Sequence, residues 1–204
     1  MTEEVPIRSG GRDGKRLIHL GVAAFLVTCV VLFLFGGLLL PGAHSEPRFR
    51  VHETARASAD GTFQVTLDTS DRKHWVHFDL GAGSISTVSA DRKGPGDLLL
   101  RRHALGAPHG AMKLGKVPLA AAHRPPAGAS WVNDTDVGGE RQNPALGHWY
   151  GYSYATHVLR SSGETYAVRL AGGAVALLNI VSYYCEPEGS GCLTLRYRLE
   201  LEGG

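Results

Sequence analysis

Histidine offers the most versatile chemistry in this sequence, because a neutral imidazole can bind haem iron and can also exchange a proton near neutral pH. The chain has ten histidines, nine of them outside its long apolar segment. Ligation of one iron by two histidines requires imidazoles that face each other across a flat apolar slot. His74 and His77 are an odd number of residues apart on an expected strand and point to opposite faces. The candidates outside the expected stalk are then His103, His109, His123, His148 and His157.

A cluster of aromatic residues precedes the last of these histidines. Trp149, Tyr150, Tyr152 and Tyr154 fall within six residues. Such rings can stack on a porphyrin, pack against a sheet, or contact another protein, where tyrosine and tryptophan are enriched. We expect these four residues to form a protein interface.

Sequence motifs argue against catalysis. The chain lacks HExxH, GxSxG, a P-loop and a dinucleotide-binding fingerprint. Asp134 and Asp136 suggest calcium, but they lack an EF-hand register and are more typical of a turn. We therefore expect a protein that is not an enzyme and has no metal site of its own. After Leu40 there are 17 Lys and Arg against 16 Asp and Glu, so nucleic acid is not an expected partner.

The segment from Leu17 to Leu40 organises the rest of the chain. It has 24 residues without a formal charge, and as a helix it would extend about 36 Å, enough to cross a bilayer. A signal peptide usually has a shorter apolar region and a small-residue cleavage site. The segment therefore predicts one retained transmembrane helix. Four basic residues precede it, which places residues 1–16 in the cytoplasm and the C-terminal part in a bacterial periplasm.

The three cysteines separate into two groups. Cys29 lies within the apolar segment, where it most simply packs as a small apolar residue. Cys185 and Cys192 are the remaining pair, and an oxidising compartment would allow them to form a disulfide. We expect this bond to close the turn between the last two strands.

The remaining sequence predicts a mainly β domain. Residues 41–60 are polar and broken by proline, as expected for a stalk, and the domain itself is expected over 61–204. Alternating apolar residues predict strands at Thr62–Asp68, His74–Leu80 and Cys192–Leu201. Ala174–Cys185 is bulky on both faces, which favours a central strand. Residues 106–146 are rich in glycine and proline, and a connection of this length is usually functional or lies over a sheet.

Several blocks, taken in order, resemble the HmuY-like family. They are WVHFDLGAG, DLLLRR, NPALGHWYGYSYATHVL, ETYAVRL and NIVSYYC-x6-CLTLRY, between about Trp75 and Tyr197. The family's type members are extracytoplasmic all-β haem-binding proteins, so the resemblance implies an antiparallel β fold and haem as a cofactor. Two departures are visible. Gly96 stands where family sequences commonly have Trp before the Asp of the DLLLRR block, and an apolar segment replaces the lipid anchor.

If haem is bound, we expect His157 and His123 to be its two ligands, because one lies among aromatic residues and the other in the long loop. Ordinary surface or hydrogen-bonded histidines are the alternative. Our leading functional prediction is a non-catalytic, membrane-anchored periplasmic subunit that stabilises a respiratory or photosynthetic complex, with integral membrane proteins and the bilayer as partners. The alternative is a periplasmic haem-binding or haem-transfer protein of HmuY type.

Overall fold

The chain divides into two units, Met1–Ser45 and Glu46–Gly204. The computed structural model describes residues 13–39, 46–137 and 140–200. In the first unit, helix α1 spans Asp13–Leu39. Across these described residues, we find no helix that has both the length and the apolar character needed to cross a membrane. The transmembrane helix expected over residues 17–40 is therefore not confirmed. Residues 1–12 of the expected cytoplasmic tail lie outside the described residues.

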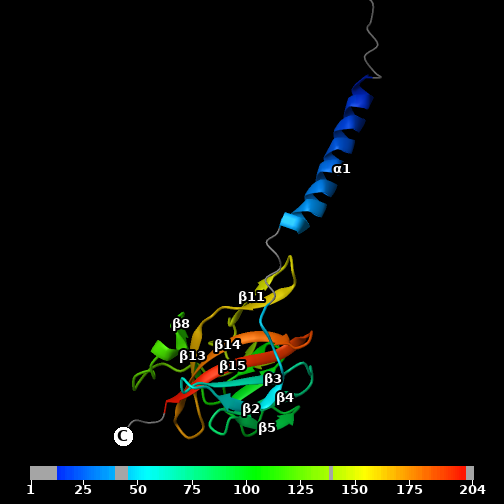
Figure 1. Ribbon diagram of the computed structural model, residues 1–204. Coiled ribbons are helices and arrows are strands. Elements are labelled where there is room, and N and C mark those ends of the chain that lie inside the picture. Colours follow the sequence, from blue (N-terminus) through cyan, green and yellow to red (C-terminus); the bar gives the residue numbers. More distant parts are fainter. Residues whose placement is uncertain (1–12, 40–45, 138–139, 201–204) are drawn as a thin grey trace, which may run out of the picture. The chain divides into compact units, whose positions relative to one another are not determined.

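The second unit consists mainly of antiparallel β-strands, as the sequence predicts (Figure 1). Short strands dominate its first two thirds, and the two longest strands come last. The strands are β1 (Arg48–Phe49), β2 (His52–Ala57), β3 (Phe63–Asp68), β4 (Trp75–Asp79), β5 (Ser84–Ser89), β6 (Leu98–Arg101), β7 (Ala104–Gly106), β8 (Ala111–Gly115), β9 (Thr135–Val137), β10 (Glu140–Gln142), β11 (Tyr150–Ser153), β12 (Val158–Ser161), β13 (Thr165–Arg169), β14 (Val175–Cys185) and β15 (Ser190–Glu200). A short 3₁₀ helix, η1, spans Leu119–Ala121.

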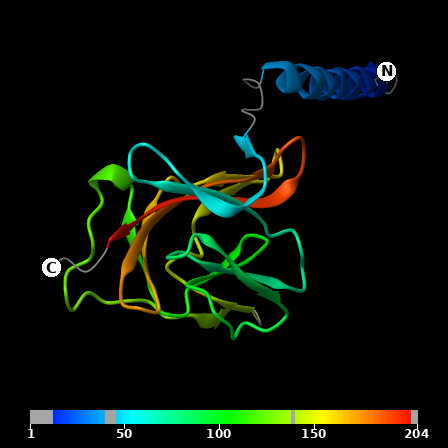
Figure 2. The ribbon, with the colours of Figure 1, turned by 60° about the horizontal axis from the view of Figure 1, so that its bottom comes forward.

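Within the described part of the chain, eleven strands form one main sheet. Its order is β7-β6-β4-β5-β2-β3-β15-β14-β13-β8, and β1 joins it by pairing in parallel with β14. The sheet bends over itself rather than lying flat (Figure 2). Two hairpins, β9–β10 and β11–β12, form separate two-stranded sheets. The predicted central position of the strand at residues 174–185 is confirmed, because β14 lies between β13 and β15.

The main core lies on the inner side of the bent sheet. Its buried residues come from distant places in the strand order, including Phe78 of β4, Leu100 of β6, Tyr166 of β13 and Leu195 of β15. Alternation along each strand brings every second side chain to this inner side. Burying these residues removes apolar surface from water, which is the main favourable contribution to folding.

The long connection after β8 covers the outer side of β13 and β14. Leu119 and Ala122 pack there with Ala167, Val175 and Leu177 to form a second, smaller core. This packing confirms that the long loop-rich region lies over the sheet. It also explains why β14 is buried on both faces and therefore lacks a simple alternating pattern.

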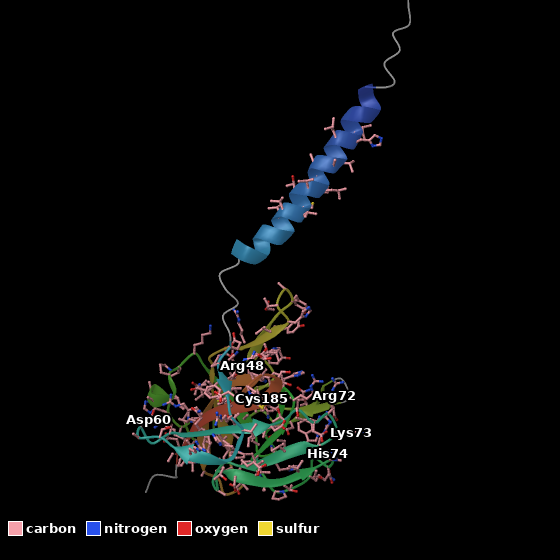
Figure 3. All side chains as sticks on the ribbon, turned by 45° about the vertical axis from the view of Figure 1, so that its right-hand side comes forward. Arg48, Asp60, Arg72, Lys73, His74 and Cys185 are labelled. Carbon is pink, nitrogen blue, oxygen red and sulfur yellow. A yellow bond between two sulfur atoms is a disulfide. The ribbon has the colours of Figure 1, made fainter. Side chains whose placement is uncertain are left out.

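The predicted stalk over residues 41–60 is corrected by the structure. Residues 41–45 lie outside the described residues, but β1 and β2 belong to the main sheet. The register of β1 pairs Arg48 with Tyr184 and Phe49 with Cys185, and Figure 3 shows Arg48 and Cys185 at the same end of the domain. Only two residues of β2, His52 and Ala55, are partly buried, so its sequence lacks the apolar alternation that marks a strand.

Gly96 has a steric reason to be glycine. Its φ angle is +145°, and a Cβ atom there would lie 3.1 Å from the Cβ of His77. His77 itself is fully buried. Any larger residue at this position would press against His77 and strain the backbone.

The predicted disulfide between Cys185 and Cys192 is present, with 5.2 Å between the two Cα atoms. Cys192 is buried, whereas Cys185 is partly exposed. The bond closes the connection between β14 and β15, so it links the two longest strands of the sheet near one end.

Candidate functional site

The β11–β12 hairpin carries the aromatic cluster together with one of the two predicted haem ligands. Its register pairs Tyr150 with Ser161 and Ser153 with Val158, so residues 154–157 form the turn. It stands apart from the main sheet (Figure 1). A two-stranded hairpin is marginally stable alone, so contacts with the domain must hold this one.

Three contacts fix the hairpin to the domain. The Leu159 backbone N–H donates a hydrogen bond of 2.8 Å to the Tyr184 hydroxyl, and the Ser161 hydroxyl donates to the Ile180 carbonyl. An ion pair of 2.9 Å joins Arg160 to Glu46. All three contacts involve β12, so the returning strand anchors the hairpin to the domain.

His157 is held in the turn by a tyrosine. Its Nδ1 lies 2.6 Å from the Tyr152 hydroxyl. Because the Tyr152 hydroxyl can donate or accept, this hydrogen bond is compatible with either neutral tautomer of the imidazole. When Nδ1–H donates to the tyrosine oxygen, Nε2 carries a lone pair and can bind a metal. His157 is exposed and has a φ angle of +54°, which is uncommon for a residue other than glycine.

A second tyrosine extends this exposed surface. The ring of Tyr154 meets that of Tyr152 edge to face, with 5.0 Å between the ring centroids. Tyr154 is 85% exposed and Tyr152 is 43% exposed. We name Tyr152, Tyr154 and His157 the hairpin cluster. It presents two aromatic rings and an imidazole on one short turn.

The other two aromatic residues of the sequence motif lie at the base of the hairpin. Trp149 is buried in the main core, and its indole N–H donates a hydrogen bond of 2.9 Å to the His103 carbonyl. Tyr150 is partly buried, and burial followed by the proximity of Tyr183 raises the pKa of its hydroxyl. Of the four residues expected at an interface, Tyr152 and Tyr154 are thus the exposed ones, whereas Trp149 is enclosed by its own domain.

The structure does not bring His123 to the hairpin cluster. His123 is exposed and follows Ala122, which packs beside Leu177 near the start of β14. The hairpin instead contacts Tyr184 near the end of the same strand. These two positions are seven residues apart in β14, which corresponds to about 23 Å of strand. Two ligands of one iron lie within a few ångströms of each other, so this arrangement does not place both histidines on the same haem.

The remaining histidines have other surroundings. His77 is buried, and its Nε2–H donates to the Asp91 carbonyl at 2.9 Å. His74 pairs with Asp71 at 2.7 Å. The hydrogen bond from the Lys73 backbone N–H, followed by that from His74, lowers the pKa of Asp71 to about 2. His103 is exposed and packs edge to face against Tyr150. Within the described ranges, no cluster of three or more His, Cys, Asp or Glu side chains could hold a metal ion.

Comparison with known proteins identifies the fold. No protein-family model matches the sequence, and neither does any curated protein. Among solved structures, the chain is similar to a candidate HmuY-like haem-binding protein from Bacteroides vulgatus ATCC 8482. The TM-score is 0.60 and the identity 18%, over 76% of this chain and 100% of that one.

Two further structures support the same assignment. A candidate lipoprotein from Bacteroides fragilis NCTC 9343 matches with a TM-score of 0.57 and 19% identity, over 73% of this chain and 95% of that one. The apo form of an HmuY analogue from Tannerella forsythia matches with a TM-score of 0.56 and 14% identity, over 69% and 96%. The domain therefore has an HmuY-like fold, as its sequence blocks predict.

Proposed function

We propose that this protein binds haem non-covalently outside the cytoplasm, with His157 of the hairpin cluster as an iron ligand. The observation that carries the proposal is the HmuY-like fold, which the domain shares with a solved structure described as that of an HmuY-like haem-binding protein. This likeness favours haem binding over the other predicted role, that of a subunit stabilising a membrane complex.

The chemistry of the hairpin cluster fits haem. Imidazole is a common axial ligand of haem iron, and its other ring nitrogen is normally held by a hydrogen bond. Tyr152 supplies that bond to Nδ1 of His157, leaving Nε2 as the ligand atom. The exposed ring of Tyr154 can stack on a porphyrin face. When bound, haem would supply the iron that His157 coordinates and a large apolar surface.

Two observations support the proposed compartment. The disulfide between Cys185 and Cys192 is of a kind that persists in oxidising compartments and is rare in the cytosol. One of the similar structures is a candidate lipoprotein, a class that is attached to membrane surfaces. Both support an extracytoplasmic location.

Titration of the purified chain with haemin, followed at the Soret band, tests the proposal. We expect saturable binding with one haem per chain and a spectrum typical of histidine ligation. His157→Ala should abolish that spectrum. Tyr152→Phe should retain the imidazole but weaken binding by about 10- to 100-fold, because it removes the hydrogen bond that orients the ligand.

His123→Ala is the matched control, because it removes an exposed imidazole that lies elsewhere on the domain. We expect it to bind haemin as the unchanged chain does. A Soret spectrum that is lost in His123→Ala but intact in His157→Ala would contradict our assignment of the ligand. No saturable binding by the unchanged chain would refute haem binding itself.

A further inference from the structure

A cavity of about 490 Å³ in the second unit is lined by Leu99 of β6 and by residues of three connecting segments, one of which contributes Pro108. Three of its lining residues, Arg92, Lys93 and Gly94, come from the connection between β5 and β6. Asn133 and Asp134 line it from the segment that leads into β9. A volume of this size is in the range of pockets that bind small molecules.

The β5–β6 connection is held in place before any ligand arrives. The Nε2–H of His77 donates to the Asp91 carbonyl at 2.9 Å, and the Ser86 hydroxyl donates to the Pro95 carbonyl at 2.7 Å. Gly94 rests directly on the His77 ring, because a Cβ atom there would lie 2.9 Å from both Cε1 and Nδ1. Arg92 and Lys93 are therefore presented by a preformed loop.

Each of the two cations keeps hydrogen-bond donors that its neighbours do not use. The Arg92 guanidinium lies 5.1 Å from the ring centroid of Trp75, which orients it. It also forms an ion pair with the exposed Asp136 carboxylate at 3.9 Å, a separation beyond hydrogen-bonding distance. Lys93 is exposed, and its ammonium group forms no ion pair with any described side chain. Both groups keep donors available for a ligand.

Asp134 lines the same cavity, but its carboxylate forms hydrogen bonds within the domain. Its Oδ1 accepts hydrogen bonds from the Ala107 backbone N–H at 2.9 Å and from the Asn143 side chain at 3.0 Å. The first bond ties the segment before β9 to the β7–β8 connection, and the second ties it to the residue that follows β10. The Asp134 oxygen is thus already used within the fold, whereas Arg92 and Lys93 line the cavity with unused donors, which an oxyanion would accept.

We propose that this cavity binds a small molecule bearing an oxyanion, a phosphate or a carboxylate, through Arg92 and Lys93. Arginine and lysine donate charge-assisted hydrogen bonds to both kinds of oxyanion. This site is separate from the hairpin cluster, since the two share no residue. It therefore gives the domain a second ligand whose binding does not depend on haem.

Isothermal titration of the full chain with inorganic phosphate and, separately, with citrate tests the proposal at constant ionic strength. The two arms distinguish a phosphate from a carboxylate ligand, and we expect saturable binding of at least one probe. Lys93→Met and Arg92→Met should each weaken that binding by about tenfold or more, since each removes a hydrogen bond to a charged group. Chemical-shift changes of backbone amides should centre on residues 92–94 and 133–134.

Lys116→Met is the matched control, because Lys116 is also exposed and follows β8, at the opposite end of the strand order. It should bind the probe as the unchanged chain does. Equal weakening by Lys116→Met and Lys93→Met would overturn the proposal and indicate non-specific attraction to net charge. Absence of saturable binding by both probes would also overturn it. Because Arg92 packs on Trp75, Arg92→Met could disturb folding. In that case the binding measured for Lys93→Met tests the proposal.

Discussion

Removing the disulfide between Cys185 and Cys192 should lower the free energy of unfolding by a predictable amount. The bond closes a loop with a sequence separation of 7 residues. In the chain-entropy model, this cross-link restricts the unfolded state by about 2.4 kcal/mol at 25 °C. The folded sheet should keep its shape, because β14 and β15 pair along most of their length without the bond. Replacing both cysteines by alanine should therefore destabilise the domain without changing its secondary structure.

Equilibrium unfolding in urea measures this effect for three samples. These are the oxidised chain, the same chain reduced with dithiothreitol, and the Cys185→Ala/Cys192→Ala variant. Reduction should cost about 2.4 kcal/mol. The variant should lose slightly more, because Cys192 is buried and its sulfur contributes to packing. If neither reduction nor substitution changed the unfolding free energy by more than about 0.5 kcal/mol, the entropic reasoning would be refuted.

Two other changes test polar contacts elsewhere in the domain. Asp97 is buried and accepts hydrogen bonds from the backbone N–H groups of Leu80 and Ala171. Asp97→Ala should therefore lower the free energy of unfolding in urea by about 2–4 kcal/mol. A decrease of less than about 1 kcal/mol would contradict this role. The pKa of Glu164 lies below its usual 4.5, mainly because its carboxylate accepts a hydrogen bond from the Lys113 ammonium. The ionised carboxylate therefore stabilises the folded state above pH 4.5, and this stabilisation is lost as the pH falls. Glu164→Gln should thus lower the melting temperature at pH 7 but have a shrinking effect below pH 4.5, and a pH-independent difference would exclude the ion pair as its cause.

Much of the sheet could be predicted because its strands carry their own pattern. Phe63–Asp68 and Trp75–Asp79 lie within one residue of the expected bounds. The last strand begins at Ser190 rather than at Cys192 and ends at Glu200. Alternating apolar residues mark such strands, since the main core contacts every second side chain. The disulfide was predictable for a different reason, namely that two cysteines flank one short turn.

The sequence does not predict strands that form because they pair with neighbouring segments rather than because of their own apolar pattern. In β2 only every third residue is partly buried, so its sequence lacks the alternation of a typical strand. This segment is a strand because its backbone pairs with β3 and β5. Over the β11–β12 hairpin, the sequence indicates an aromatic-rich segment but no strand pair. Its turn contains His157 at a positive φ angle where a glycine would have signalled the bend.

The candidate site was predictable in its residue types but not in its arrangement. The sequence indicated His157 and its aromatic neighbours, yet it could not reveal that Tyr152 approaches the imidazole across the turn. The distance between His123 and His157 depends on which end of β14 each loop contacts. That information lies in the topology of the sheet rather than in the spacing of the two residues.

The pairing of β3 with β15 has a consequence for how the protein is made. Thr66 and Thr194 share a hydrogen bond across these strands although they are 128 positions apart in the chain. At about 5–20 residues per second, a ribosome needs roughly 6–26 seconds to add the missing partner. During that time β3 has an unpaired edge, which is a template for aggregation. The nascent chain therefore needs protection until its last strand is synthesised, and slower aggregation at lower temperature should raise its soluble yield.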